Sequence, residues 1–195
     1  MTYTSSQHGR LQRRPSLNGN YISTFRQVLS RHCVVMISVT VVCFWGLDSN
    51  QLLKLGFTKF NVAPFYYLVA LPVLLLLFAG YLLWRQRAID SRSVFWILYL
   101  LLISILEEIT FRLMLPLAIL SSTGLVIGIM LSNTIFATIH FFTLRWKLIN
   151  CIAAFLGGLG LSRLFYVTED LALIILVHLF FTFINTPSPP RDLRT

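Results

Sequence analysis

Hydrophobic residues in this chain gather into long runs that short polar stretches separate, and six such runs are visible. A helix needs roughly 20 apolar residues to cross a hydrocarbon layer about 30 Å thick. Backbone polar groups in lipid must be satisfied within the helix itself, so each run is predicted to be a membrane helix. The predicted fold class is therefore all-α, a polytopic transmembrane helical bundle of about six spans. The predicted helices are 32–47, 63–84, 94–120, 124–143, 148–167 and 171–185.

The composition excludes an ordinary soluble domain. Of the 195 residues, 56% are hydrophobic and 12% are charged, against roughly 25% charged residues in a typical soluble domain. The length is typical of one domain. Because residues 1–30 are polar and hold few large apolar groups, they are predicted to form a disordered cytoplasmic tail. One transmembrane domain is predicted over 31–186 and a second cytoplasmic tail over 187–195.

The basic residues indicate the orientation of the helices. If the N-terminus is cytoplasmic and the spans alternate, twelve Lys and Arg residues fall on the cytoplasmic side, against Lys54 and Lys59 on the other. This excess predicts a multi-pass protein of the inner or cytoplasmic membrane with both termini cytoplasmic. Since the net charge of +9 resides mainly in these short loops, membrane lipid is the expected partner and nucleic acid is not. The twelve are Arg10, Arg13, Arg14, Arg26, Arg31, Arg85, Arg87, Arg92, Arg145, Lys147, Arg191 and Arg194.

Three charged residues interrupt the third run. Glu107 and Glu108 lie near its middle, where a carboxylate costs several kcal/mol. A break between two half-spans would place them in water, but no Gly, Pro or Asn marks a turn between 94 and 115. Arg112 lies four residues after Glu108, so the two can pair on one helix face. Glu107 is rotated by about 100° from Glu108 around the helix axis. This geometry predicts that Glu107 is free to take part in a reaction, whereas the Glu108–Arg112 pair supports the site.

Two histidines lie inside other runs, His140 in the fourth and His178 in the sixth. Either one alone could be a packing residue, but with the glutamates they can converge from three helices on one point. One suitable chemistry is a general base that activates water, with imidazole donors for an oxyanion. Another is a metal site, since two His and one Glu form a catalytic zinc set, although the HExxH spacing is absent. His8 and His32, in the tail and at the first membrane boundary, are assigned no role.

Glu107 and His140 can meet only if their side chains lie at the same depth in the membrane. Glu107 lies near the middle of its run, whereas His140 lies three residues before the end of the fourth run. Bringing the two side chains together requires tilted helices, or a fourth helix that continues through residues 141–146. The sequence alone leaves both arrangements open.

The same residues fall into motifs of a known family. The segment Glu107-Glu108-Ile-Thr-Phe-Arg112 resembles the EExxxR motif of the CPBP family, which comprises CAAX proteases and bacteriocin-processing enzymes of the Abi type. The segment Phe136-Ala-Thr-Ile-His140 resembles the second motif of that family, FxxxH. Both motifs lie on separate predicted helices, in the order that the family shows.

The third motif of the family, HxxxN, is matched in part. His178 and the segment that leads to it resemble this motif, and the whole resemblance covers roughly residues 94–185. The family has Asn four residues after the histidine, where this chain has Thr182. A threonine hydroxyl can also donate a hydrogen bond, with a shorter reach. Asn185, seven residues after His178, lies on the same helix face.

The resemblance implies a protease-like transmembrane domain and a glutamic-type endopeptidase activity that needs neither a metal nor another cofactor. Its substrate would be a membrane-associated protein or peptide, by CAAX-type, sorting-tail or bacteriocin processing. The roles carried over by motif are water activation by Glu107 with His140, oxyanion binding by His178 and Thr182, support by Glu108 and Arg112, and packing beside the site by Phe136.

Two other functions fit part of the sequence. A catalytically weak or inactive immunity or scaffold protein on the same fold is favoured by Thr182, and it is opposed by the retained glutamates and histidines. A small proton-coupled carrier would also hold buried Glu and His residues. Carriers of this kind tend to show internal repeats and helices broken at matching places, and neither feature is visible in this sequence.

Overall fold

The computed structural model describes residues 13–14, 22–47, 49–85 and 89–190 of the chain. Within these ranges the elements are helical, and an isolated bridge joins Arg13 to Trp146. Five helices are long and apolar enough to cross a membrane, and a sixth apolar helix is shorter. The predicted all-α polytopic bundle is therefore confirmed.

The helices follow one another with short connections. Two π-helical segments are continuous with their neighbours, so that Phe25–Gly46 and Ser91–Leu120 each form one long apolar helix. The elements are α1 (Phe25–Val28), a π segment (Leu29–Cys33), α2 (Val34–Gly46), α3 (Ser49–Gly56), α4 (Thr58–Val62), α5 (Pro64–Trp84), α6 (Ser91–Glu108), a π segment (Ile109–Met114), α7 (Leu115–Thr123), α8 (Leu125–Thr143), α9 (Leu148–Thr168) and α10 (Leu171–Asn185).

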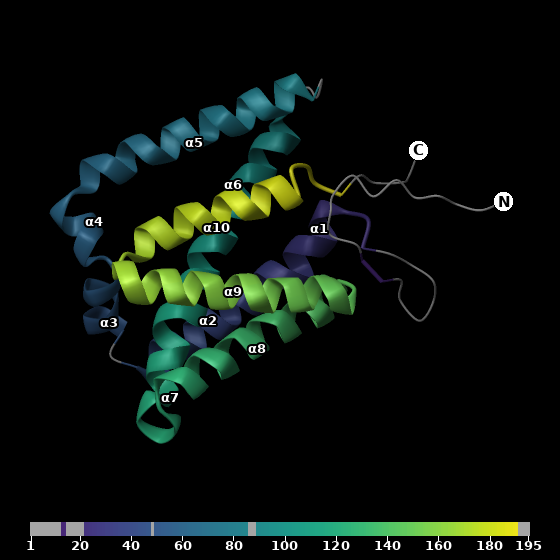
Figure 1. Ribbon diagram of the computed structural model, residues 1–195. Coiled ribbons are helices and arrows are strands. Elements are labelled where there is room, and N and C mark those ends of the chain that lie inside the picture. Colours follow the sequence, from purple (N-terminus) through teal and green to yellow (C-terminus); the bar gives the residue numbers. More distant parts are fainter. Residues whose placement is uncertain (1–12, 15–21, 48, 86–88, 191–195) are drawn as a thin grey trace.

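Figure 1 shows how the helices are arranged. Helices α8 and α9 lie side by side, and α10 packs against α6, which passes behind it in this view. Helix α5 runs along the outer edge and contacts α10. The short helices α3 and α4 lie at the end of the bundle away from α1. The packed centre is formed where α6, α8, α10 and the first helix meet.

The first membrane helix begins earlier than the sequence predicts. It starts at Phe25 and not at residue 32. Thr24 and Gln27 form a capping box, which satisfies backbone N–H groups at the start of a helix and so fixes its first residue here. The helix thereby takes in residues 25–30 of the predicted tail, while 1–12 and 15–21 lie outside the described residues. The other predicted spans agree with the observed helices to within three residues.

Polar residues at the connections determine where the central helices begin and end. Asp90 caps the start of α6 by accepting from the backbone of Ser93, and Asp170 caps α10 in the same way. Gly124, at φ 80°, lets the chain turn between α7 and α8. The two aspartates therefore fix the first residues of α6 and α10, the helices that carry Glu107 and His178.

Several contacts tie distant parts of the chain together at one end of the bundle. The backbone N–H of Arg14 donates to the carbonyl of Arg145 at 2.6 Å. At the same end, Trp96 Nε1 donates to the Thr186 carbonyl at 2.8 Å. These contacts place the N-terminal segment, the start of α6 and the ends of α8 and α10 together.

Helix α9 approaches α8 closely at Gly158. A Cβ atom at this position would lie 2.1 Å from Asn133 Oδ1 and 3.1 Å from an Arg112 guanidinium nitrogen. The Asn133 side chain cannot move away freely, because its Nδ2 donates to Ser162 and to the Ile129 carbonyl. Its Oδ1 in turn accepts from Arg112 at 2.9 Å. Gly158 therefore permits the contact that lets Asn133 hold Arg112.

Gly158→Ala is expected to destabilise the protein by about 1–3 kcal/mol, since the added methyl group overpacks a region that cannot relax. The apparent thermal unfolding midpoint in detergent measures the effect. Gly157→Ala is the matched control on the same helix, because a Cβ there meets no atom within 4 Å. Equal midpoints for the two variants would contradict the packing argument.

Candidate active site

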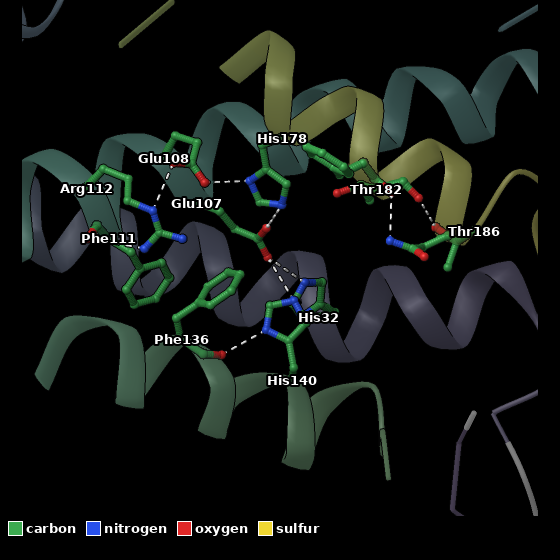
Figure 2. A network of polar contacts seen from close by, with 12 residues as sticks. His32, Glu107, Glu108, Phe111, Arg112, Phe136, His140, His178, Thr182 and Thr186 are labelled. Atoms are coloured by element: carbon green, nitrogen blue, oxygen red, sulfur yellow. Dashed lines mark hydrogen bonds and ion pairs between the residues drawn. The ribbon is translucent and has the colours of Figure 1, made fainter. Parts of the chain in front are cut away.

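Four helices bring one carboxylate and three imidazoles together in the centre of the bundle (Figure 2). Glu107 comes from the last turn of α6, His140 from α8 and His178 from α10. His32 comes from the π segment of the first helix. All four side chains are buried.

The three imidazoles surround Glu107 at short distances. The Nε2 atom of His32 lies 3.0 Å from Oε1 of the carboxylate, and that of His140 lies 3.4 Å from the same oxygen. The Nε2 atom of His178 lies 3.4 Å from Oε2. The convergence of Glu107, His140 and His178 that the sequence predicts is therefore present.

The other nitrogen of each ring is held by a hydrogen-bond acceptor outside this cluster. His140 Nδ1 donates to the Phe136 carbonyl at 2.8 Å, and His32 Nδ1 contacts Thr143 Oγ1 at 2.8 Å. The Thr143 hydroxyl donates its hydrogen to the Ile139 carbonyl, so its oxygen accepts from His32. The anchored Nδ1–H groups turn both Nε2 atoms towards Glu107.

Glu108 lies next to Glu107 but has different partners. Its Oε2 lies 3.1 Å from Arg112 Nε, in the i,i+4 pair that the sequence predicts. Its Oε1 accepts from His178 Nδ1 at 2.5 Å, which orients that ring in the same way as the other two. Because Arg112 compensates its charge, Glu108 is a fixed anchor for His178.

Phe136 packs beside the site, as the sequence predicts. Its ring makes edge contacts with His140, at 4.5 Å between centroids, and with His178, at 6.2 Å. The Arg112 guanidinium lies 5.0 Å from the centroid of the same ring. The Phe136 ring thus lies against two of the histidines and against Arg112, the partner of Glu108.

A cavity of about 570 Å³ opens beside these residues, and all four cluster side chains line it. Thr182 and Asn185 also line this cavity, and Figure 2 shows Thr182 beyond His178 on the same helix. Across the described ranges, no hydrogen bond joins the Thr182 hydroxyl to Glu107 or His178. The structure thus places Thr182 at the cavity wall and not in contact with the carboxylate.

The geometry differs from the sequence interpretation at His32, which was assigned no role. It lies inside the first helix and contacts Glu107 directly. The depth condition is met without a longer fourth helix, because α8 ends at Thr143 and does not continue to residue 146, and Figure 1 shows α8 running obliquely to α6. Glu107 lies about 24 Å along α6 from Ser91, whereas His140 lies about 5 Å from the end of α8.

One set of side chains could hold a metal ion. His32, Glu107 and His140 each offer one ligand atom, and these atoms lie within 4.8 Å of one another. Two His and one carboxylate are a ligand set of catalytic zinc sites. The set differs from the one considered from the sequence, which paired Glu107 with His140 and His178.

The comparisons with known proteins give one match, to a family model. A model of the type II CAAX prenyl endopeptidase Rce1-like family matches residues 89–184, about half of the chain. Neither the curated proteins nor the solved structures contain a match. The matched region includes Glu107, His140 and His178, and it begins well after His32 of the first helix. This integral, multi-pass membrane protein belongs to the Rce1-like family of CAAX-type endopeptidases.

Proposed function

We propose that the protein is a metal-independent, glutamic-type intramembrane endopeptidase that uses Glu107 to activate water. The observation that carries this proposal is a buried carboxylate ringed by three Nε2 atoms at 3.0 to 3.4 Å, at the wall of a cavity of about 570 Å³. An ionisable residue within a membrane helix is rare enough to be a candidate functional residue by default. The family match supports a peptidase with a protein or peptide substrate.

In this proposal Glu107 and His140 hold the attacking water between them. His140 Nδ1 is engaged with the Phe136 carbonyl, so its Nε2 accepts a hydrogen bond from the water. The water oxygen attacks the peptide carbonyl carbon while a water proton passes to Glu107. Glu107 then gives this proton to the leaving amine as the carbon–nitrogen bond breaks.

His178 and Thr182 bind the oxyanion that forms on the carbonyl oxygen. His178 donates through Nε2 when its ring also keeps the Nδ1 proton that Glu108 accepts. Glu108, held by Arg112, therefore supports the donor without touching substrate. Thr182 lines the same cavity and adds its hydroxyl as the second donor.

The substrate proposed is a membrane-associated protein or peptide of the CAAX, sorting-tail or bacteriocin-precursor class. Apolar residues such as Leu100, Ile103 and Phe181 line much of the cavity, which suits a lipidated or hydrophobic segment. The proposed orientation has both termini cytoplasmic, and it is supported by the contacts of Arg14 with Arg145 and of Arg92 with Pro190.

Glu107→Gln is expected to lower kcat by at least about 100-fold, because the amide cannot take the proton from water. The assay measures cleavage of prenylated CAAX peptides and sorting-tail peptides by the purified protein in liposomes. Glu169→Gln, at an exposed position, is the matched control and should cleave as the wild type does. A chelator should leave wild-type cleavage unchanged. Activity that survives in Glu107→Gln, or that is lost with the chelator, would contradict the glutamic mechanism.

The second candidate function is a weak or inactive scaffold on the same fold, and Thr182 favours it. If Thr182 is an oxyanion donor, Thr182→Val should lower kcat by about 100- to 1000-fold. Thr182→Asn should raise kcat above the wild type, because the longer amide reaches further into the cavity. Kinetics of both variants on the same peptides decide the point. If both variants cleave as the wild type does, Thr182 has no role in the reaction. If neither the wild type nor either variant cleaves a peptide, the scaffold function is favoured.

A further inference from the structure

His32 is a buried imidazole that belongs to the first membrane helix and lies outside the region that the family model matches. It is separated from Glu107 by 75 residues in the sequence, yet its Nε2 approaches that carboxylate more closely than those of His140 and His178. We propose that His32 is a positioning residue of the peptidase site, which holds Glu107 Oε1 in the orientation that activates water. The proposal rests on the proposed function of Glu107.

The hydrogen bonds of His32 show how it holds the carboxylate. Since Thr143 gives its own hydrogen to the Ile139 carbonyl, its oxygen accepts from His32 Nδ1, which therefore carries a proton. In a neutral ring the Nε2 atom would then present a lone pair to Glu107 Oε1 at 3.0 Å. Two acceptors do not approach this closely without a hydrogen between them. One proton therefore lies between His32 and Glu107.

This shared proton gives His32 a different task from His140. It occupies one lone pair of Glu107 Oε1 and restricts rotation of the carboxylate. The longer separation of His140, 3.4 Å from the same oxygen, suits a ring that accepts from a water molecule. The remaining lone pairs of Glu107 are left to take the proton of the attacking water.

Polar contacts on both sides of His32 fix its place against the other helices. On one side Arg31 donates to the carbonyl of Phe142, at the end of α8, at 3.3 Å. On the other side Thr40 and Thr110 share a hydrogen bond of 2.8 Å between their hydroxyls. In the part of the chain that the structure describes, each of the two π segments carries a side chain of this network, His32 in one and Arg112 in the other. Such segments occur often at functional sites.

Kinetics of His32 variants test the proposal on the peptides used for Glu107. His32→Ala should lower kcat by about 100-fold with KM unchanged, because the carboxylate loses its orientation. His32→Gln should recover part of this loss, since its amide N–H can donate to Oε1. Thr143→Val should also lower kcat, because it removes the acceptor that orients the ring. The matched control is Thr138→Val on the same helix, an exposed threonine with the same i−4 bond to the backbone, and it should leave kcat unchanged.

Three kinetic or binding results would overturn the proposal. The first is a kcat of His32→Ala equal to that of the wild type, in a protein whose Glu107→Gln variant is inactive. The second is a His32→Gln variant no more active than His32→Ala, which would show a packing role. The third is a stoichiometric metal ion bound by the purified wild type and lost in His32→Ala, which would make His32 a ligand.

A measurement without substrate separates this proposal from the proposed function. The protein is labelled with ¹⁵N-histidine, and the ring signals in detergent are assigned by single substitutions of the four histidines. Glu107→Gln should shift the Nε2 signal of His32, and Glu169→Gln should not. An unshifted His32 signal in Glu107→Gln overturns the contact even where no peptide is cleaved. A shifted signal in a protein that cleaves no peptide supports the contact and rejects the proposed function.

Discussion

The burial of the Glu107 carboxylate is the constraint on which the rest of the structure depends. A charge at this depth is tolerated only with polar partners, and its own helix offers none at i+4, where Phe111 stands. The partners come instead from the first helix, α8 and α10. Each imidazole is held through its Nδ1 atom, so its Nε2 atom reaches Glu107 only when the helices are packed in these relative positions. The packing of four helices and the geometry of the site are therefore one network, and removing Glu107 affects both.

Glu108 has the same side chain as Glu107 and lies next to it in the helix, but its different neighbours give it a different role. Glu108 is neutralised by Arg112 on its own helix, and Arg112 is held by Asn133 of α8. Asn133 can stay in place because Gly158 of α9 has no side chain. The network thus extends from α9 through α8 to α6, and it ends at His178 Nδ1. A helix that supplies no side chain to the cluster still determines the orientation of one of its rings.

Local patterns in the sequence were sufficient for the last five spans and for the Glu108–Arg112 pair, because hydropathy and an i,i+4 spacing act within one helix. They were not sufficient for His32. The residues before it are polar, so the first helix was predicted to begin at residue 32, whereas a capping box at Thr24 begins it seven residues earlier. The partners of His32 lie 75 and 111 residues away, beyond the reach of any periodicity. The π segments left no signal in the apolar pattern either.

Inclined helices also explain how a residue deep in its own helix can be supplied with water. Glu107 is about 24 Å along α6, but it meets His140 about one turn from the end of α8, so the site is shallow when reached along α8. The cavity beside the cluster is lined by polar residues such as Asn150 and Thr186 and by apolar ones such as Leu100 and Phe181. The proposed hydrolysis needs both water and a hydrophobic peptide segment at one carboxylate, and Glu107 lies at the wall of a cavity that has both polar and apolar lining.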